Sequence, residues 1–232
     1  PGFNRFVWNM RYPGPEIKID KLLERKGYKP LGRGEGGPGG GPVAPPGNYQ
    51  VCFKLDGKEY KHSFKIFKDP RLETTSEDFA AQFELWNKIT KRVSETNAAI
   101  NSIRRIMCQI EELLSRDTLA KSISQKSAKE VRKNAETLLG KLKILENELT
   151  QTKNETPSDR LRHPAMLKER MEALVSNVSV ADSVPPQQAY DVFEHLSKQI
   201  DQKLKQMNLV CEKDLSSLNQ LIENAGIPKL HG

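Results

Sequence analysis

The sequence is poor in the residues that build covalent and metal-bound frameworks. Its 232 residues include only three cysteines and four histidines. Cys52, Cys108 and Cys211 lie far apart and form no C-x-x-C pair, which argues against a disulfide framework and a zinc site. No histidine has a His partner four residues away or an H-E-x-x-H context; the four are His62, His163, His195 and His231. The sequence therefore predicts no metal site.

Long hydrophobic runs are also lacking. No stretch approaches the roughly 18 apolar residues that indicate a membrane helix, so we expect no membrane span. Charged residues make up 29% of the chain, which is typical of long helices with solvated outer faces. The chain opens at Pro1 without a methionine, so we expect a fragment whose targeting signal lies upstream.

The net charge of +7 is unevenly distributed along the chain. Residues 1–72 hold 14 Lys+Arg against 7 Asp+Glu, whereas residues 73–232 hold 23 of each. The excess includes a basic insert at 16–33 and has no aromatic platform beside it, so a solvated surface is favoured over a phosphate-binding one. A nucleic-acid-binding protein that uses this basic part is the alternative.

The hydrophobic rhythm changes period at Asp69-Pro70-Arg71. Before this point Tyr49, Val51 and other apolar residues alternate with polar ones, which indicates a half-buried strand. After it, apolar residues recur every three or four positions, which is the spacing of one helix face. The pattern predicts an α+β chain of two units, 1–70 and 71–232, with a hinge over 69–73.

Three strands are predicted in the first unit. Residues 4–12 alternate, and a Gly/Pro-rich insertion at 15–46 follows. Residues 48–55 and 58–67 flank Asp56-Gly57, the dipeptide typical of a type I′ hairpin turn. Three strands are too few for a closed two-sheet core, so part of the apolar surface should stay uncovered.

Four helices are predicted in the second unit. Their apolar stripes span about 76–114, 125–151, 163–180 and 186–225. Pro164 and Pro185-Pro186 mark helix starts, and Gly226 followed by Pro228 marks a stop. Short connectors favour antiparallel neighbours, so we expect an antiparallel, up-down bundle of long helices.

Candidate chemistry is sparse. Residues 32–37 match G-x-G-x-x-G, but a Pro/Gly run follows where a dinucleotide site needs a helix, so no cofactor is expected. The acid pairs Glu111–Glu112 and Glu146–Glu148 fit solvated helix faces better than an acid/base pair. The glycosylation triplets 154–156 and 177–179 matter only in a eukaryotic secretory pathway. No catalytic, cofactor-binding or metal-binding residue is predicted.

Two stretches carry a family resemblance. They are residues 2–14, GFNRFVWNMRYPG, and residues 41–51, GPVAPPGNYQV, followed by Asp56-Gly57-Lys58 and Asp69-Pro70-Arg71. Together they resemble the region after the β-propeller in microbial sortilin-like proteins with Asp-box (BNR) repeats, often labelled glycosyl hydrolases. The helical part also fits, over 79–101 and 219–228. The sequence departs from the family in the insert at 16–33 and at Asn9, where an acid is expected.

The resemblance implies a partial Ig-like β-sandwich followed by a helical domain. It also implies a non-catalytic accessory, interaction or spacer module of an extracytoplasmic protein, whose partner is the upstream propeller or another protein. Any glycosidase site would belong to that propeller, because no Asp-box motif occurs here. A hydrolase in its own right is the remaining alternative.

Overall fold

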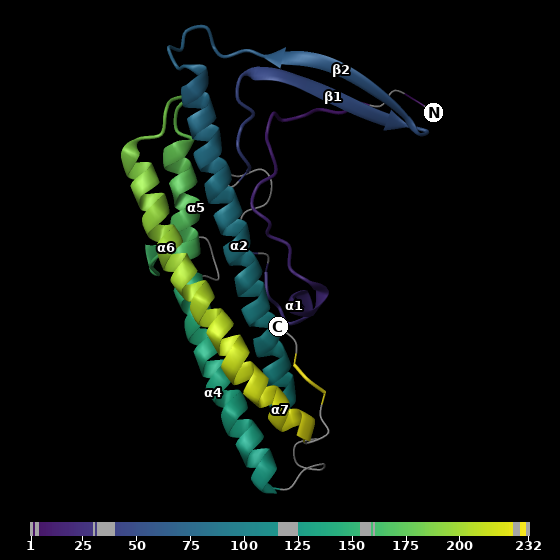
Figure 1. Cartoon of the computed structure of the whole chain (residues 1–232), viewed down its shortest axis with the longest axis vertical. Coiled ribbons are helices and arrows are strands. Elements are labelled where there is room, and N and C mark those ends of the chain that lie inside the picture. Colours follow the sequence, from purple (N-terminus) through teal and green to yellow (C-terminus); the bar gives the residue numbers. More distant parts are fainter. Residues whose placement is uncertain are drawn as a thin grey trace.

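A computed structural model shows a long helical bundle with a β-hairpin projecting near one end (Figure 1). It describes residues 2, 5–29, 31, 40–115, 125–153, 159, 161–224 and 228–230. The helices are α1 (Lys21–Arg25), α2 (Ser76–Ser115), α4 (Gln125–Leu149), α5 (Leu167–Val178), α6 (Gln187–Val210) and α7 (Ser216–Asn224). The two strands are β1 (Gly47–Leu55) and β2 (Lys58–Ile66). The four predicted helical stripes lie on α2, α4, α5 and the α6–α7 segment.

The long helices pack in three rows, and each row runs antiparallel to the row before it in the chain. Glu111 of α2 pairs with Lys143 of α4, and the Gln82 amide of α2 bonds to the carbonyl of Val178 at the end of α5. Both α4 and α5 therefore run antiparallel to α2, one after the other along its length. The long segment α6–α7 runs back beside them, with Lys203 and Glu148 in contact at 2.8 Å.

The expectation that α4 and α5 are antiparallel neighbours is therefore wrong. The carboxylate of Glu169, in the first turn of α5, accepts bonds from the Thr150 hydroxyl (2.6 Å) and the Gln151 N–H (3.2 Å) just after α4. It also accepts the N–H of Met166 (3.1 Å). These bonds hold the end of α4 against the start of α5. The contacts of both helices with α2 show that the chain continues in the same direction.

The α6–α7 segment is continuous through a π-helical turn, Cys211–Leu215. The apolar stripes of all these helices meet in one core. Its best-buried side chains include Leu85, Ile89, Ile100, Ile103, Ile106, Ile110, Leu138, Leu142, Leu149 and Met171. No helix among the described residues is long and apolar enough to cross a membrane.

The Ig-like β-sandwich is not present, and this expectation is wrong. The structure holds a two-stranded antiparallel sheet, β1–β2, and no second sheet in the described part of the chain. The segment expected to form a first strand makes only a bridge between Arg11 and Val43. Met10 adopts a left-handed backbone (φ 56°), which ends the extended run before a ladder can grow.

The hairpin itself is confirmed. β1 and β2 pair in register from Gly47–Ile66 to Leu55–Lys58. Asp56 and Gly57 both have positive φ (49° and 76°), as a two-residue type I′ turn requires.

Candidate interaction surface

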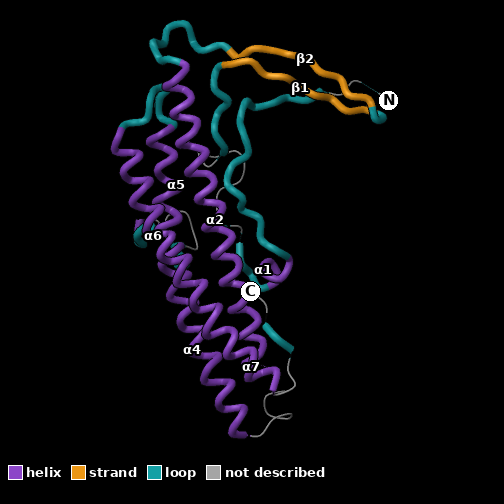
Figure 2. Tube along the Cα trace, in the orientation of Figure 1, coloured by secondary structure: helices purple, strands orange, loops and turns teal. Residues whose placement is uncertain are grey.

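The residues before the hairpin form a strap, residues 5–29 and 31, that follows α2 along its length (Figure 2). At its start the Trp8 ring lies 5.9 Å from Tyr49 and 6.2 Å from Phe64, so it covers the base of the hairpin. Further on, the Tyr12 ring meets Phe83 of α2 edge-on at 4.8 Å. The strap therefore joins the hairpin to the bundle.

A row of polar side chains on α2 binds the backbone of the strap. The Ser94 hydroxyl accepts the N–H of Glu16 (3.0 Å), and Asn97 donates to the carbonyl of Glu16 (2.8 Å). One turn on, Asn101 donates to the carbonyl of Lys18 (3.1 Å). These bonds satisfy backbone groups of a segment that has no strand partner there. Leu23 and Leu31 of the strap are buried against the bundle.

The strap site is not among the sequence-based predictions. Its signal is the polar set Ser94, Asn97, Asn101 and Arg105, spaced three and four residues apart on one face of a helix. Asn97 and Asn101 are buried, which is unusual for asparagine unless its groups are bonded. Arg105 adds an ion pair to Asp20 (2.7 Å), the N-cap of α1.

An internal ion pair lies below the strap. Arg104 and Glu146 are both buried and meet at 2.6 Å between α2 and α4, so the prediction that Glu146 lies on a solvated face is wrong. The Tyr28 ring covers the Arg104 guanidinium at 4.7 Å. Burial, reinforced by the negative charge of Glu146, raises the pKa of Tyr28 to about 12. This cluster ties the strap, α2 and α4 together.

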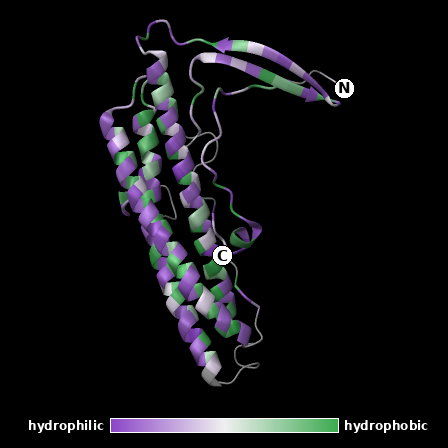
Figure 3. Ribbon diagram, viewed as in Figure 1, coloured by the Kyte–Doolittle hydropathy of each residue, from purple (hydrophilic) through white to green (hydrophobic). Residues whose placement is uncertain are grey.

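The hairpin presents two contrasting faces, visible as alternating colours in Figure 3. Cross-strand pairing puts seven apolar side chains on one of them, the apolar face, together with Lys58 and His62: Tyr49, Val51, Phe53, Leu55, Tyr60, Phe64 and Ile66. Phe53 is 59% exposed and Tyr60 is 55% exposed, although their rings are in contact. Val51 and Leu55 on the same face are exposed as well.

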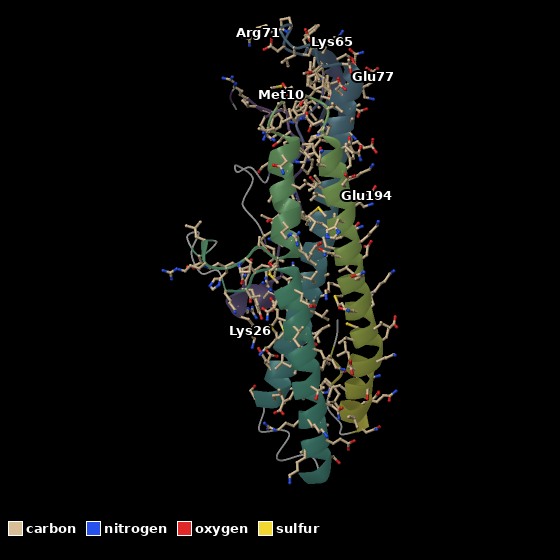
Figure 4. The ribbon with its side chains drawn as sticks, turned by 90° about the vertical axis from the view of Figure 1, so that its left-hand side faces the viewer. Met10, Lys26, Lys65, Arg71, Glu77 and Glu194 are labelled. Carbon is tan, nitrogen blue, oxygen red and sulfur yellow. The ribbon has the colours of Figure 1, made fainter. Side chains whose placement is uncertain are left out.

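The opposite face of the hairpin is basic. It carries Lys54, Lys61 and Lys65, with Glu59 placed 3.9 Å from Lys54 and 3.0 Å from Lys61. Lys65 lies over the Phe67 ring at 5.2 Å. Figure 4 shows Lys65, Arg71 and Met10 near the same end of the molecule, with Lys26 far down the bundle.

Two other basic residues of the N-terminal part, Lys26 and Arg11, contact the bundle. Lys26 pairs with Glu112 at 3.0 Å, and this contact raises the pKa of Lys26. Arg11 lies over the Trp86 ring at 5.6 Å and donates to the carbonyl of Gly41 (3.0 Å). Part of the positive charge at 16–33 is thus directed at α2.

The structure does not gather the candidate chemical residues into a site. His62 and His195 are exposed on different elements, His163 is half-buried, and no group of three metal-ligating side chains occurs in the described ranges. Burial raises the pKa of the Cys108 and Cys211 thiols, while Cys52 is exposed. The glycine motif at 32–37, the triplet at 154–156 and His231 lie outside the described residues.

The remaining acids and the second glycosylation triplet are also accounted for. Glu111 faces Lys143, Glu112 faces Lys26 and Glu148 faces Lys203. Asn177 is exposed at the end of α5, but Val178 beside it is buried.

Comparison with models of known protein families, with curated proteins and with solved structures finds no significant match.

Proposed function

We propose that this chain is a non-catalytic interaction and spacer module of a larger extracytoplasmic protein of the sortilin-like, Asp-box type. The observation that carries the proposal is the exposed apolar face of the hairpin, held near one end of a helical arm. At 1.5 Å per residue, α2 alone is about 60 Å long. An arm of this length separates what binds at its two ends. Its upstream propeller, or another protein, is the partner that we propose.

The pKa shifts of two acidic groups, and the ion pair of a third, support a non-catalytic role. Glycoside hydrolysis uses two carboxyl groups about 5 to 10 Å apart across a cleft, one of them with a raised pKa. Here the pKa of Asp69 is lowered by Arg71, and that of Asp78 is lowered by the N–H and hydroxyl of Thr75. Both shifts oppose the role of a general acid, and the buried Glu146 is neutralised by Arg104.

The test is an activity assay on residues 1–232 with a panel of nitrophenyl glycosides and reducing-sugar detection on polysaccharides. We expect no turnover above the buffer control. Glu146→Gln and Asp69→Asn serve as matched variants, since one acid is buried and the other is exposed. Turnover by the purified chain that one carboxylate-to-amide change abolishes, in a variant that circular dichroism shows to be folded, would overturn the proposal in favour of a hydrolase.

A further inference from the structure

The outer edge of β2 lacks a partner strand among the described residues. In an antiparallel pair every second residue of each strand directs its N–H and C=O groups away from its partner. In Figure 2 the strap lies on the β1 side of the hairpin, and β2 is the far strand. A two-stranded sheet is marginally stable on its own, so a third strand would add both hydrogen bonds and apolar burial.

The side chains of β2 define what that strand would carry. An added strand places alternate residues on the two faces of the hairpin. On the apolar face they would meet Tyr60, His62 and Phe64. On the basic face they would meet Lys61 and Lys65. On β2 this face has two lysines to one glutamate, so acidic side chains are the complement.

We propose that the outer edge of β2 binds an extended segment of another protein in which apolar and acidic residues alternate. This inference rests on the proposed function as an interaction module and names the chemistry of the partner. The segment pairs its backbone with β2, its apolar residues extend the apolar face, and its acids lie beside Lys61 and Lys65.

Two other occupants fit the surface less well. A lipid bilayer would have to accept the apex, where Asp56 and Lys58 flank Gly57, while the apolar side chains run along the hairpin instead of gathering at its tip. A second copy paired antiparallel through the same edge, with Ser63 at its centre, would set Lys61 of each copy opposite Lys65 of the other. Like charges directly opposite on neighbouring strands are destabilising, and dimerisation is one of the outcomes tested below.

The experiment measures fluorescence anisotropy with three labelled nine-residue peptides and the full chain. One alternates Val and Glu, one alternates Val and Lys, and one is a scrambled Val/Glu sequence. We expect the Val/Glu peptide to bind at least tenfold more tightly than the other two. Amide hydrogen exchange should slow along β2 in the complex, and alternate N-methylation of the peptide should abolish binding because it removes backbone donors.

Charge-reversal variants provide the matched control. Lys61→Glu with Lys65→Glu should invert the preference so that the Val/Lys peptide binds better. Lys129→Glu with Lys133→Glu changes the net charge equally on exposed positions of α4 and should leave the preference unchanged. Circular dichroism verifies that each variant is folded.

Several results would overturn the inference. They are equal binding of the scrambled peptide, no inversion on charge reversal, binding to phosphatidylglycerol vesicles without peptide binding, and dimerisation of the chain through β2. Any of these results would leave the proposed non-catalytic function unaffected. Glycoside turnover would instead refute that proposed function without changing the peptide-binding result.

Discussion

At the scale of single residues, the Arg104–Glu146 pair is the most consequential polar contact in the bundle. Both side chains are buried, so removing one charge leaves the other without compensation. We expect Glu146→Gln to lower the free energy of unfolding by roughly 3 kcal/mol. Glu84→Gln, which breaks the exposed pair with Lys88, should cost less than about 1 kcal/mol. Urea unfolding of both variants measures the difference.

A double substitution separates burial cost from pairing. Replacing Arg104 and Glu146 together by Met and Leu removes both charges, so the double variant should recover most of the stability lost in Glu146→Gln. A double variant as unstable as the single one would show that the pair supplies more than mutual charge compensation.

Tyr28 reports on the same cluster through its pKa. Burial raises this pKa to about 12, so folding favours the protonated phenol. Its contribution to stability is therefore complete below pH 10 and is lost as the pH rises from about 10 to about 12. Burial raises the pKa of Tyr49 as well. Absorbance titration of tyrosinate should show a group that titrates near pH 12 and disappears in Tyr28→Phe. A Tyr28→Phe titration identical to that of the unsubstituted chain would contradict the assignment.

At the scale of elements, replacing either of two glycines by alanine should change stability in opposite directions. A Cβ on Gly41 would overlap the backbone carbonyls of Tyr12 and Pro13, where the strap meets the segment before β1. Gly41→Ala should therefore destabilise the chain by roughly 1–3 kcal/mol and free the strap. A Cβ on Gly140 meets nothing within 4 Å inside α4, so Gly140→Ala should stabilise it by about 0.5–1 kcal/mol.

Thermal melts of both variants, with limited proteolysis of the strap, measure these effects. Cleavage between residues 13 and 29 should accelerate in Gly41→Ala and not in Gly140→Ala. Equal melting shifts for the two variants would mean that the strap does not approach the segment before β1 as closely as the structure shows.

The sequence predicted these elements unevenly, for physical reasons. The hairpin was predictable because Asp56-Gly57 sets its turn and the alternation of Tyr49 to Leu55 sets its face. The strand expected over 4–12 was not found, because alternation cannot reveal that Met10 takes a positive φ. The strap was missed because its bonds join backbone groups to Asn97 and Asn101, which lie about 80 positions away in the chain.

At the scale of the whole molecule, direction was the hardest property to predict. The stripes of α4 and α5 indicate two helices but not whether the chain reverses between them. The contacts of α4 and α5 with opposite ends of α2 settle that. The bonds of Glu169 to Thr150 and Gln151 fix the loop conformation between the two helices, which periodicity does not encode. Likewise, no sequence signal distinguishes a sandwich from a hairpin when only two strands pair.

The division of the chain near residue 70 stays a prediction, and the structure shows how to test it. Residues 75–230 contain the core helices, but a chain truncated to these residues lacks Leu23 and Leu31 and leaves Asn97 and Asn101 without their strap partners. We expect it to remain helical and to unfold cooperatively. Its free energy of unfolding should fall by several kcal/mol, since burying each leucine contributes about 1.5–3 kcal/mol.

Circular dichroism and urea titration of residues 75–230, beside the full chain, provide the measurement. The matched control is the full chain with Asn97→Ala and Asn101→Ala, which loses the strap bonds of these two side chains but keeps both leucines. It should be destabilised by only about 1–3 kcal/mol, because each lost hydrogen bond contributes about 0.5–1.5 kcal/mol. If the truncated bundle melts without cooperativity, the strap belongs to the bundle's core and the chain is one folding unit.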